Sequence, residues 1–400
     1  MDDGARRELQ LRIAIVSGDD VLGEDPEQLC AALAAQGHDA TVCLRRAGRR
    51  SVQAAAAGYY RCLSVPVGPR RAAPSVDVLP YVGDWAAKLE RAWSREQPDV
   101  VHAYGWLAGL AAQLAAGRLR IPVVQTFLGL AATSRGQADA KHNRERARVE
   151  PMLARSAVWV TGESSEDIEA LARLRRRRTE VSALTCVVDA LRYAPIGSTA
   201  SRNGLRRVLC VTPNTLWCNG IDIVIRALPK VRAAELVIAE NDATNGDHDD
   251  ARARLQHLAA ELGVADRVRF VGPVADDQLP QLIRSAEVVV CTPRQPPRAT
   301  TVLQAMATGV AVIVATVGVL TDVVLDDITG LIVPPESPIA VAGALRRLLG
   351  QSFQCESMGA AGRSRAMSRF AWERIALDAL NIYGSIGSPD RARLRSTAAR

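Results

Sequence analysis

The residues best suited to bind a ligand lie between positions 291 and 318. This stretch, CTPRQPPRATTVLQAMATGVAVIVATVG, begins as a loop with three prolines and continues as a helix of small residues. Arg294 and Arg298 could supply positive charge to a phosphate. Thr300 and Thr301 could cap the helix and expose its first N–H groups to the same anion. The alternative, that both arginines are solvated loop residues, is equally open.

Carboxylates are missing from this region. No Asp or Glu occurs between Glu287 and Asp322. A site that holds a polyhydroxylated ligand would ordinarily use a carboxylate to accept hydrogen bonds from its hydroxyl groups. The absence therefore bears directly on what the loop can bind.

The cysteines and histidines do not indicate a metal site or a cofactor. None of the eight cysteines forms a C-x-x-C pair, and five histidines are too few to favour a zinc site. Cys43, Cys210 and Cys291 lie in apolar runs typical of strands, so buried free thiols are predicted there.

The formal charge of +7 is unevenly distributed. The run RLRRRR at 173–178 and the tail after residue 387 supply much of the excess. A solvated helix end and a disordered tail are favoured over nucleic-acid binding, because no aromatic residues interleave with the arginines. Weak peripheral contact with an anionic membrane remains an option. The polar N-terminus and the short apolar runs predict no signal peptide and no transmembrane helix, hence a cytoplasmic protein.

The elements that must position these residues alternate between strands and helices. Residues 11–45 read as a β-α-β unit, and the same alternation continues to about residue 195. A polar stretch rich in Gly and Ser, 194–207, reads as a linker. A second alternating series follows, with strand-like runs that include 207–213, 234–240, 286–293 and 311–317. The sequence therefore predicts an α/β protein of two doubly wound, Rossmann-like domains, with a ligand cleft between them at the strands' carboxyl ends.

Several segments together resemble one family. PDVVHAYGWLAGLAAQLAAGRLRIPVVQTF resembles the N-terminal half of the retaining glycosyltransferases of family 4, which have the GT-B fold. GIDIVIRALPKV, LPQLIRSAEVVVCTP and VLQAMATGVAVIVATVGVLTDVVLDDITGLIVPP resemble the C-terminal half, in order.

The resemblance implies an acceptor-side domain at 1–197 and a nucleotide-sugar domain at 198–371. A helix at 372–387 would cross back to the first domain, ahead of a basic tail at 388–400. It also implies transfer of a sugar, of the hexosyltransferase type, from a nucleotide diphosphate sugar, usually without a metal.

The motif positions on the donor side depart from the family. Asn214 and Asn219 stand where the family has an Arg and a Lys that neutralise the diphosphate. Pro296 and Gln304 replace the two carboxylates of its Glu-x7-Glu motif. Gln304 keeps an acceptor for a ribose hydroxyl, whereas Pro296 keeps none. A hydrogen bond to a charged group contributes roughly 1.5–3 kcal/mol, against about 1 for a neutral one.

The acceptor side departs as well. The family often has a Gly-Gly loop after the first strand, where this chain has Asp19 and Asp20, which would repel a diphosphate. His102 is kept, Tyr104 stands where a second His is common, and Leu128 replaces a His that commonly lies close to the transferred sugar. These four candidates, Asp19, Asp20, His102 and Tyr104, are the predicted acceptor-side residues.

Two hypotheses follow. In the first, the protein is an active glycosyltransferase whose donor site is rewired around Arg294 and Arg298, with a nucleotide sugar as donor and a glycan or small molecule as acceptor. In the second, it is a catalytically inactive pseudo-glycosyltransferase that binds and regulates a protein partner, such as an active glycosyltransferase. The sequence alone favours the second modestly.

Overall fold

The computed structural model describes residues 10–18, 25–46, 58–69, 75–132, 140–176, 178–184, 187–241 and 249–387. The chain forms two compact units. The first unit comprises residues 1–185 and 372–400, and the second comprises residues 186–371. The division falls before the predicted boundary at 197, because Val188 and Tyr193 pack in a core of the second unit.

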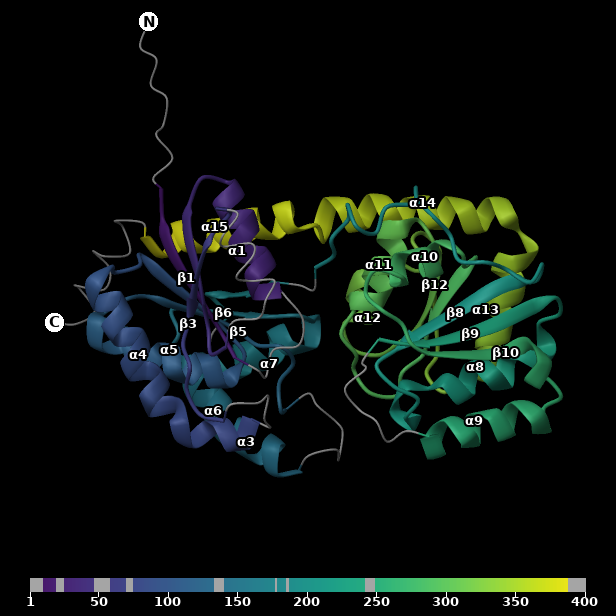
Figure 1. Ribbon diagram of the computed structural model, residues 1–400, viewed down its shortest axis with the longest axis horizontal. Helices are drawn as coiled ribbons and strands as arrows, with labels where there is room; N and C mark the ends of the chain where they lie inside the picture. The colour runs from purple at the N-terminus through teal and green to yellow at the C-terminus, as the bar shows by residue number, and fades with distance from the viewer. Residues whose placement is uncertain are drawn as a thin grey trace, which may run out of the picture. The chain divides into compact units, whose positions relative to one another are not determined.

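The first unit is built on a parallel sheet of seven strands in the order β3-β2-β1-β4-β5-β6-β7 (Figure 1). The central strands are short runs of buried apolar residues, as expected for a sheet covered on both faces. The strands are β1 (Arg12–Ser17), β2 (Asp39–Leu44), β3 (Arg61–Ser64), β4 (Val100–Tyr104), β5 (Val123–Thr126), β6 (Trp159–Gly162) and β7 (Val181–Ala183).

Helices cover both faces of this sheet. One face carries α4, α5 and α6, and the other carries α1 and α15, which pack against one another (Figure 1). The last helix of the chain thus belongs to the first unit. The helices are α1 (Asp25–Ala35), α3 (Ser75–Val78), α4 (Val82–Arg95), α5 (Trp106–Leu119), α6 (Ala140–Ser156), α7 (Ser165–Arg175) and α15 (Trp372–Gly387), with a 3-10 turn η1 (Leu79–Tyr81).

The second unit repeats the plan with six parallel strands in the order β10-β9-β8-β11-β12-β13. Strand β9, AELVIAE, is buried at every position. The strands are β8 (Arg206–Thr212), β9 (Ala234–Glu240), β10 (Val268–Pro273), β11 (Val288–Cys291), β12 (Ala311–Ala315) and β13 (Leu331–Val333). The predicted doubly wound α/β fold is confirmed in both units.

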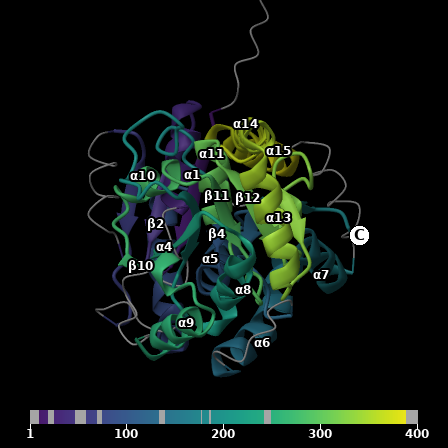
Figure 2. The ribbon, with the colours of Figure 1, turned by 90° about the vertical axis from the view of Figure 1, so that its right-hand side faces the viewer.

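Two hydrophobic cores flank the second sheet. Helices α8 and α9 lie on one side of it, and α10, α11 and α14 lie on the other (Figures 1 and 2). The helices are α8 (Ile221–Ala227), α9 (Asp249–Glu261), α10 (Leu279–Arg284), α11 (Thr300–Thr308), α12 (Leu320–Val323), α13 (Pro338–Gly350) and α14 (Ser352–Arg369), with 3-10 turns η2 (Trp217–Asn219), η3 (Leu228–Lys230) and η4 (Ala265–Arg267). Among the described residues, no helix is both long enough and apolar enough to span a membrane.

Candidate functional site

The predicted donor-side residues lie at the carboxyl ends of two neighbouring strands of the second unit. Strands β8 and β11 pair in parallel, so the loops that follow them emerge side by side. The backbone N–H of Arg294 donates to the carbonyl of Cys218 at 2.8 Å, which ties the two loops together. The structure thus brings Asn214, Asn219 and Arg294 into one region, at the edge where open α/β sheets bind ligands.

Asn214 and Asn219 are bonded to one another. The side-chain amide of Asn219 donates to the side-chain oxygen of Asn214 at 2.8 Å and to its backbone carbonyl at 3.0 Å. The Asn214 side chain also accepts from the backbone N–H of Leu216 at 3.1 Å. These hydrogen bonds hold the loop in shape, and they satisfy the side-chain donors of Asn219 within the protein.

Gly220 allows the two loops to approach. Its φ of 68° lies in the left-handed region, and a Cβ there would stand 1.9 Å from the carbonyl oxygen of Thr292. Only glycine combines this backbone conformation with so close a contact. The loop after β8 is therefore fixed against the loop after β11 at this residue.

Arg294 is held by an acid within the same unit. Its guanidinium donates two hydrogen bonds to the carboxylate of Asp222, at 2.7 and 2.9 Å, and lies 4.3 Å from the centre of the Trp217 ring. The hydrogen bonds to Asp222 raise the pKa of Arg294 above its usual value. The Arg294 side chain is only 8% exposed, and its charge is largely neutralised by the carboxylate of Asp222.

Helix α11 begins without a side-chain cap. Its N-cap is Ala299, so Thr300 and Thr301 are the first two helical residues. The prediction that the two threonines cap this helix is therefore wrong: a side chain within the first turn lies beyond the cap position. The first N–H groups of α11 receive no side-chain cap, which suits an anion. Arg298, directly before Ala299, is half-buried.

Gln304 presents an unused acceptor. Its side-chain oxygen is buried and has no hydrogen-bond partner. A buried acceptor without a partner is costly, by about 1–3 kcal/mol. Pro296, at the other position of the family's carboxylate pair, packs on Gly318, where an added Cβ would stand 2.8 Å from the proline Cβ. The two positions thus differ: Gln304 offers an acceptor, and Pro296 is an exposed proline whose side chain offers none.

His102, a predicted acceptor-side residue, is fully buried in the first unit. One ring nitrogen lies 2.6 Å from the hydroxyl of Tyr383 on α15, and the other lies 2.6 Å from the hydroxyl of Thr126 on β5. Burial lowers the pKa of His102 from 6.5 to about 3, so the ring is neutral at physiological pH. Both nitrogens are used to join β4 to its neighbours.

We expect His102 to make the first unit sensitive to acid. The folded-state pKa lies below the unfolded one, so the unfolded chain gains the proton first as the pH falls. Stability is therefore lost from about pH 6.5 downward, by up to about 1.4 kcal/mol per pH unit. His102→Gln should recover about 2 kcal/mol of that loss at pH 5.

The readout for His102 is tryptophan fluorescence during urea unfolding. Of the six tryptophans, all except Trp217 belong to the first unit, so the signal reports mainly on that unit. The same dependence of stability on pH in His102→Gln and in the wild type would contradict the assignment.

Of the other predicted acceptor-side residues, the structure describes only Tyr104. Tyr104 is buried, with its ring 4.8 Å from that of His102. Asp19 and Asp20 lie outside the described residues. The loop after β5 is fixed from α6, because the Glu150 carboxylate accepts from the Ala131 N–H at 2.9 Å.

Two residues of the donor side were missed by sequence reasoning. Asp222 neutralises Arg294, and Trp217 stacks on it while remaining 66% exposed. An aromatic residue in a polar loop was the available signal for Trp217. The pairing of Asp222 with Arg294, 72 positions away, left no signal in the sequence.

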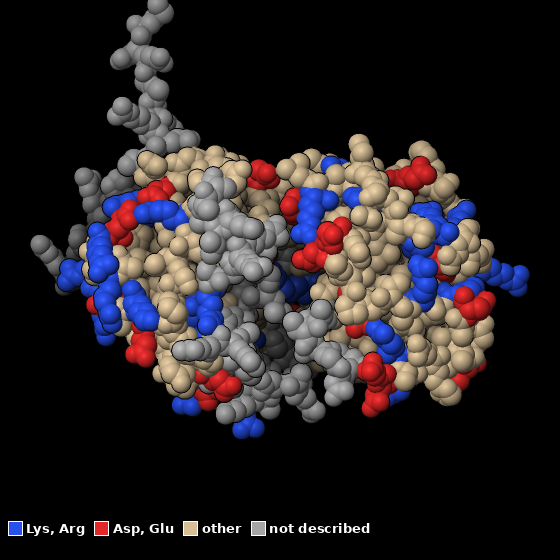
Figure 3. All heavy atoms as spheres, in the orientation of Figure 1, with Lys and Arg blue, Asp and Glu red and all other residues tan. Residues whose placement is uncertain are grey.

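The buried-thiol prediction is confirmed at two of its three cysteines, and the basic run at 173–178 is solvated only in part. Cys43 and Cys210 are buried free thiols, whereas Cys291, the last residue of β11, is half-buried. No group of His, Cys, Asp and Glu among the described residues could hold a metal ion. Within the basic run, Arg175 is not solvated: it is buried and donates to the carbonyls of Ala154 and Ala157 at the end of α6. Basic and acidic side chains are interspersed on the face shown in Figure 3.

Comparisons with known proteins agree with this geometry. The family model "Glycosyl transferases group 1" matches residues 201–365, and the model "Glycosyl transferase 4-like domain" matches residues 23–186. The chain is 30% identical to a D-inositol 3-phosphate glycosyltransferase of Salinispora tropica, over 75% of this chain and 66% of that protein. A protein of the same name from Salinispora arenicola is 30% identical over 72% of this chain and 68% of its own length.

Solved structures show the same fold. Sucrose-phosphate synthase from Thermosynechococcus elongatus superposes with a TM-score of 0.79 at 21% identity, covering 94% of this chain and 99% of that one. HepE from Anabaena, in complex with UDP-glucose, superposes with a TM-score of 0.70 at 19% identity, covering 94% of this chain and all of that one. Together with the family models and the Salinispora relatives, these matches show that the chain belongs to the group 1 glycosyltransferases of family 4, with the GT-B fold.

Proposed function

We propose that the second unit binds a nucleotide diphosphate sugar at the carboxyl ends of β8 and β11, and that the protein transfers the sugar to an acceptor with retention of configuration. The observation that carries the proposal is the side-chain oxygen of Gln304, which is buried and has no hydrogen-bond partner. Gln304 lies within two turns of the start of α11, where no side chain caps the helix. An acceptor of hydrogen bonds and a set of free N–H groups are what a sugar nucleotide requires, on its hydroxyls and its phosphates respectively.

The chemistry assigned to these groups is electrostatic. As the bond between the sugar and the diphosphate breaks, negative charge grows on the phosphate oxygen that leaves. The first N–H groups of α11 and the positive end of its dipole stabilise that charge. The acceptor hydroxyl oxygen bonds to the anomeric carbon as the bond to the diphosphate breaks, and its proton passes to the phosphate oxygen that leaves. Gln304 holds a ribose hydroxyl and thereby orients the donor.

The names of the relatives suggest an acceptor class. Both Salinispora proteins are D-inositol 3-phosphate glycosyltransferases, and the match spans about two thirds of their length. A phosphorylated cyclic polyol is therefore the first acceptor to test. HepE is known in complex with UDP and UDP-glucose, which makes UDP sugars the first donors to test.

A second candidate function is non-catalytic binding of a partner. It is favoured by the pairing of Asn219 with Asn214 and of Arg294 with Asp222. Both pairs leave the loop after β8 poor in free donors for a diphosphate. Binding of a sugar nucleotide without release of nucleoside diphosphate, in the presence of any acceptor, would support this candidate over the first.

The variant Gln304→Leu tests the binding role of the glutamine. Removing an unpartnered buried acceptor should stabilise the ligand-free protein, by about 1 kcal/mol. The same change should weaken sugar-nucleotide binding about five- to tenfold, because the ribose hydroxyl loses its partner. Calorimetric unfolding and titration give the two quantities. A merely structural residue would not move them in opposite directions.

The matched control for Gln304→Leu is Gln256→Leu. Gln256 is exposed on α9, in the same unit. This variant should leave the affinity for the sugar nucleotide unchanged. Equal affinities in wild type, Gln304→Leu and Gln256→Leu would remove Gln304 from the site.

A further inference from the structure

A second cavity lies at the opposite edge of the same sheet. It has a volume of about 460 Å³ and is formed entirely within the second unit. Three neighbouring strands begin there: β8 at Arg206, β11 just after Glu287, and β12 at Ala311. The cavity is thus at the amino-terminal edge of the sheet, whereas the proposed donor site is at the carboxyl-terminal edge.

The cavity combines an apolar floor with a basic rim. Its floor includes the buried residues Val310, Leu348 and Leu349. Its rim carries three guanidinium groups, on Arg202, Arg206 and Arg284, together with the carboxylates of Glu287 and Glu356 and the Cys355 thiol, which donates to the Glu287 carbonyl.

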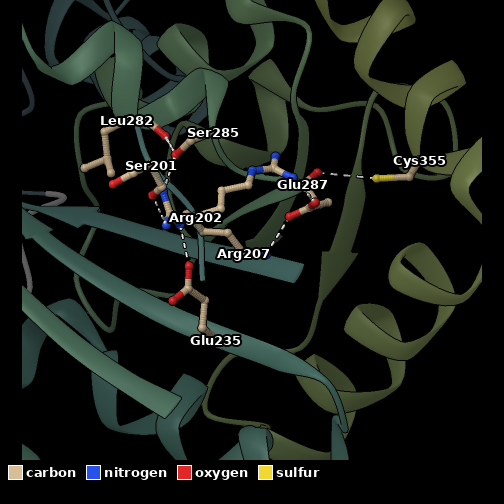
Figure 4. A network of polar contacts seen from close by, with 8 residues as sticks. All are labelled: Ser201, Arg202, Arg207, Glu235, Leu282, Ser285, Glu287 and Cys355. Atoms are coloured by element: carbon tan, nitrogen blue, oxygen red, sulfur yellow. Dashed lines mark hydrogen bonds and ion pairs between the residues drawn. The ribbon is translucent and has the colours of Figure 1, made fainter. Parts of the chain in front are cut away.

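One arginine and one glutamate of the rim neutralise each other. Arg202 donates to one carboxylate oxygen of Glu287 at 2.7 Å, and the other oxygen accepts from the backbone N–H of Arg207 (Figure 4). Both oxygens of Glu287 are therefore occupied. This pair contributes shape to the cavity and little net charge.

The other two arginines have no carboxylate partner among the described residues. Arg206 is exposed at the start of β8. Arg284 donates from Nε to the carbonyl of Ser198 at 2.8 Å and from a terminal nitrogen to that of Ala194 at 3.1 Å, so it keeps its full charge and its remaining N–H donors. The linker backbone lies directly over this guanidinium, since a Cβ on Gly197 would stand 2.9 Å from its carbon.

Helix α14 adds a further group of donors. It is 18 residues long, it starts at Ser352 on the cavity rim, and its N-cap Gln351 makes no side-chain cap. Two uncompensated guanidinium groups and a helix start favour a tetrahedral dianion. The carboxylate of Glu356, exposed on the same rim, repels an anion. Arg206, Arg284 and Glu356 together carry a net charge of one positive unit.

From this arrangement we propose that the cavity binds a small phosphate monoester, with its phosphate on Arg206 and Arg284 and its body over Val310 and Leu348. The volume exceeds that of a bare phosphate and suits a phosphorylated compound of about hexose size. The site shares no residue with the proposed donor site. Its failure would therefore leave the proposed function untouched.

The experiment measures thermal stabilisation and calorimetric binding of the full-length protein with three probes: inorganic phosphate, glucose 6-phosphate and glucose. Both phosphates should raise the melting temperature in a concentration-dependent way, and glucose should not. Arg206→Ala should weaken phosphate binding about tenfold. Glu356→Gln should tighten it about two- to fivefold, because a like charge is removed.

The control is Arg254→Ala, which removes one positive charge from an exposed position of α9 in the same unit. At fixed ionic strength it should bind phosphate as the wild type does, since non-specific attraction changes equally in both alanine variants. Absence of any phosphate effect in the wild type would overturn the proposal. Equal affinities in Arg206→Ala and Arg254→Ala would also overturn it, and would assign the phosphate to another site.

Discussion

Replacing Arg207 with alanine is expected to lower the free energy of unfolding of the second unit by about 3–5 kcal/mol. Arg207 is fully buried, and its guanidinium bonds Glu235 at 2.7 Å, the Ser285 hydroxyl at 2.6 Å and the Ser201 carbonyl at 2.7 Å (Figure 4). Glu235 is itself 2% exposed, so alanine would leave a buried carboxylate without its counter-charge. The expected loss of stability is large because a buried carboxylate would remain uncompensated, and not because the ion pair of Arg207 with Glu235 is itself strongly stabilising.

Two variants separate these contributions. Arg207→Met combined with Glu235→Leu removes both charges and should cost much less than Arg207→Ala alone. Arg202→Ala breaks an exposed pair, in which the arginine side chain is 42% exposed, and should cost at most about 1 kcal/mol. Hydrogen exchange of the β8 and β9 amides in the full-length protein measures each change. A loss in the Arg207→Met/Glu235→Leu double variant as large as in Arg207→Ala would contradict the argument.

Introducing cations at Asn214 and Asn219 should strengthen diphosphate binding. In Asn214→Arg/Asn219→Lys, the loop after β8 carries the two charges that the family resemblance implies there, and two charged contacts replace neutral ones. Each exchange is worth about 1 kcal/mol or more, so the affinity for a nucleoside diphosphate should rise about 10- to 100-fold. Calorimetric titration with UDP measures the gain.

The control for this variant is Asn214→Ala/Asn219→Ala. It loses the same hydrogen bonds between the two asparagines, at 2.8 and 3.0 Å, but gains no charge. Its affinity for UDP should not exceed that of the wild type. If the Arg/Lys variant binds UDP no better than the alanine variant, the loop after β8 does not face the diphosphate.

The fold was predictable because local signals and global structure agree. Runs such as VVVC and AVIVA are apolar and branched, and both became fully or largely buried strands, β11 and β12. Helix α11 ends where Gly309 takes a left-handed conformation, as glycine commonly does after a helix.

The site was less predictable because its pairings are tertiary. Arg294 reads as a loop cation in the sequence, but its charge is met by Asp222 on a different element. The sequence suggested His102 as a residue that contacts the acceptor. In the structure, both of its ring nitrogens are instead hydrogen-bonded in the core, to the hydroxyls of Thr126 and Tyr383. The helix cap failed for a local reason: the N-cap position of α11 falls at Ala299, one residue earlier than a threonine cap needs, so Thr300 is already the first helical residue.

The central claim is that this chain binds a sugar nucleotide although Asn214 and Asn219 stand where the family resemblance implies an Arg and a Lys. The most direct test is calorimetric titration of the wild-type protein with UDP-glucose, other UDP sugars and GDP sugars. Saturable binding of at least one of them, competed by its nucleoside diphosphate, is the predicted result. No heat of binding with any of them, at concentrations that saturate an active relative, would contradict the claim.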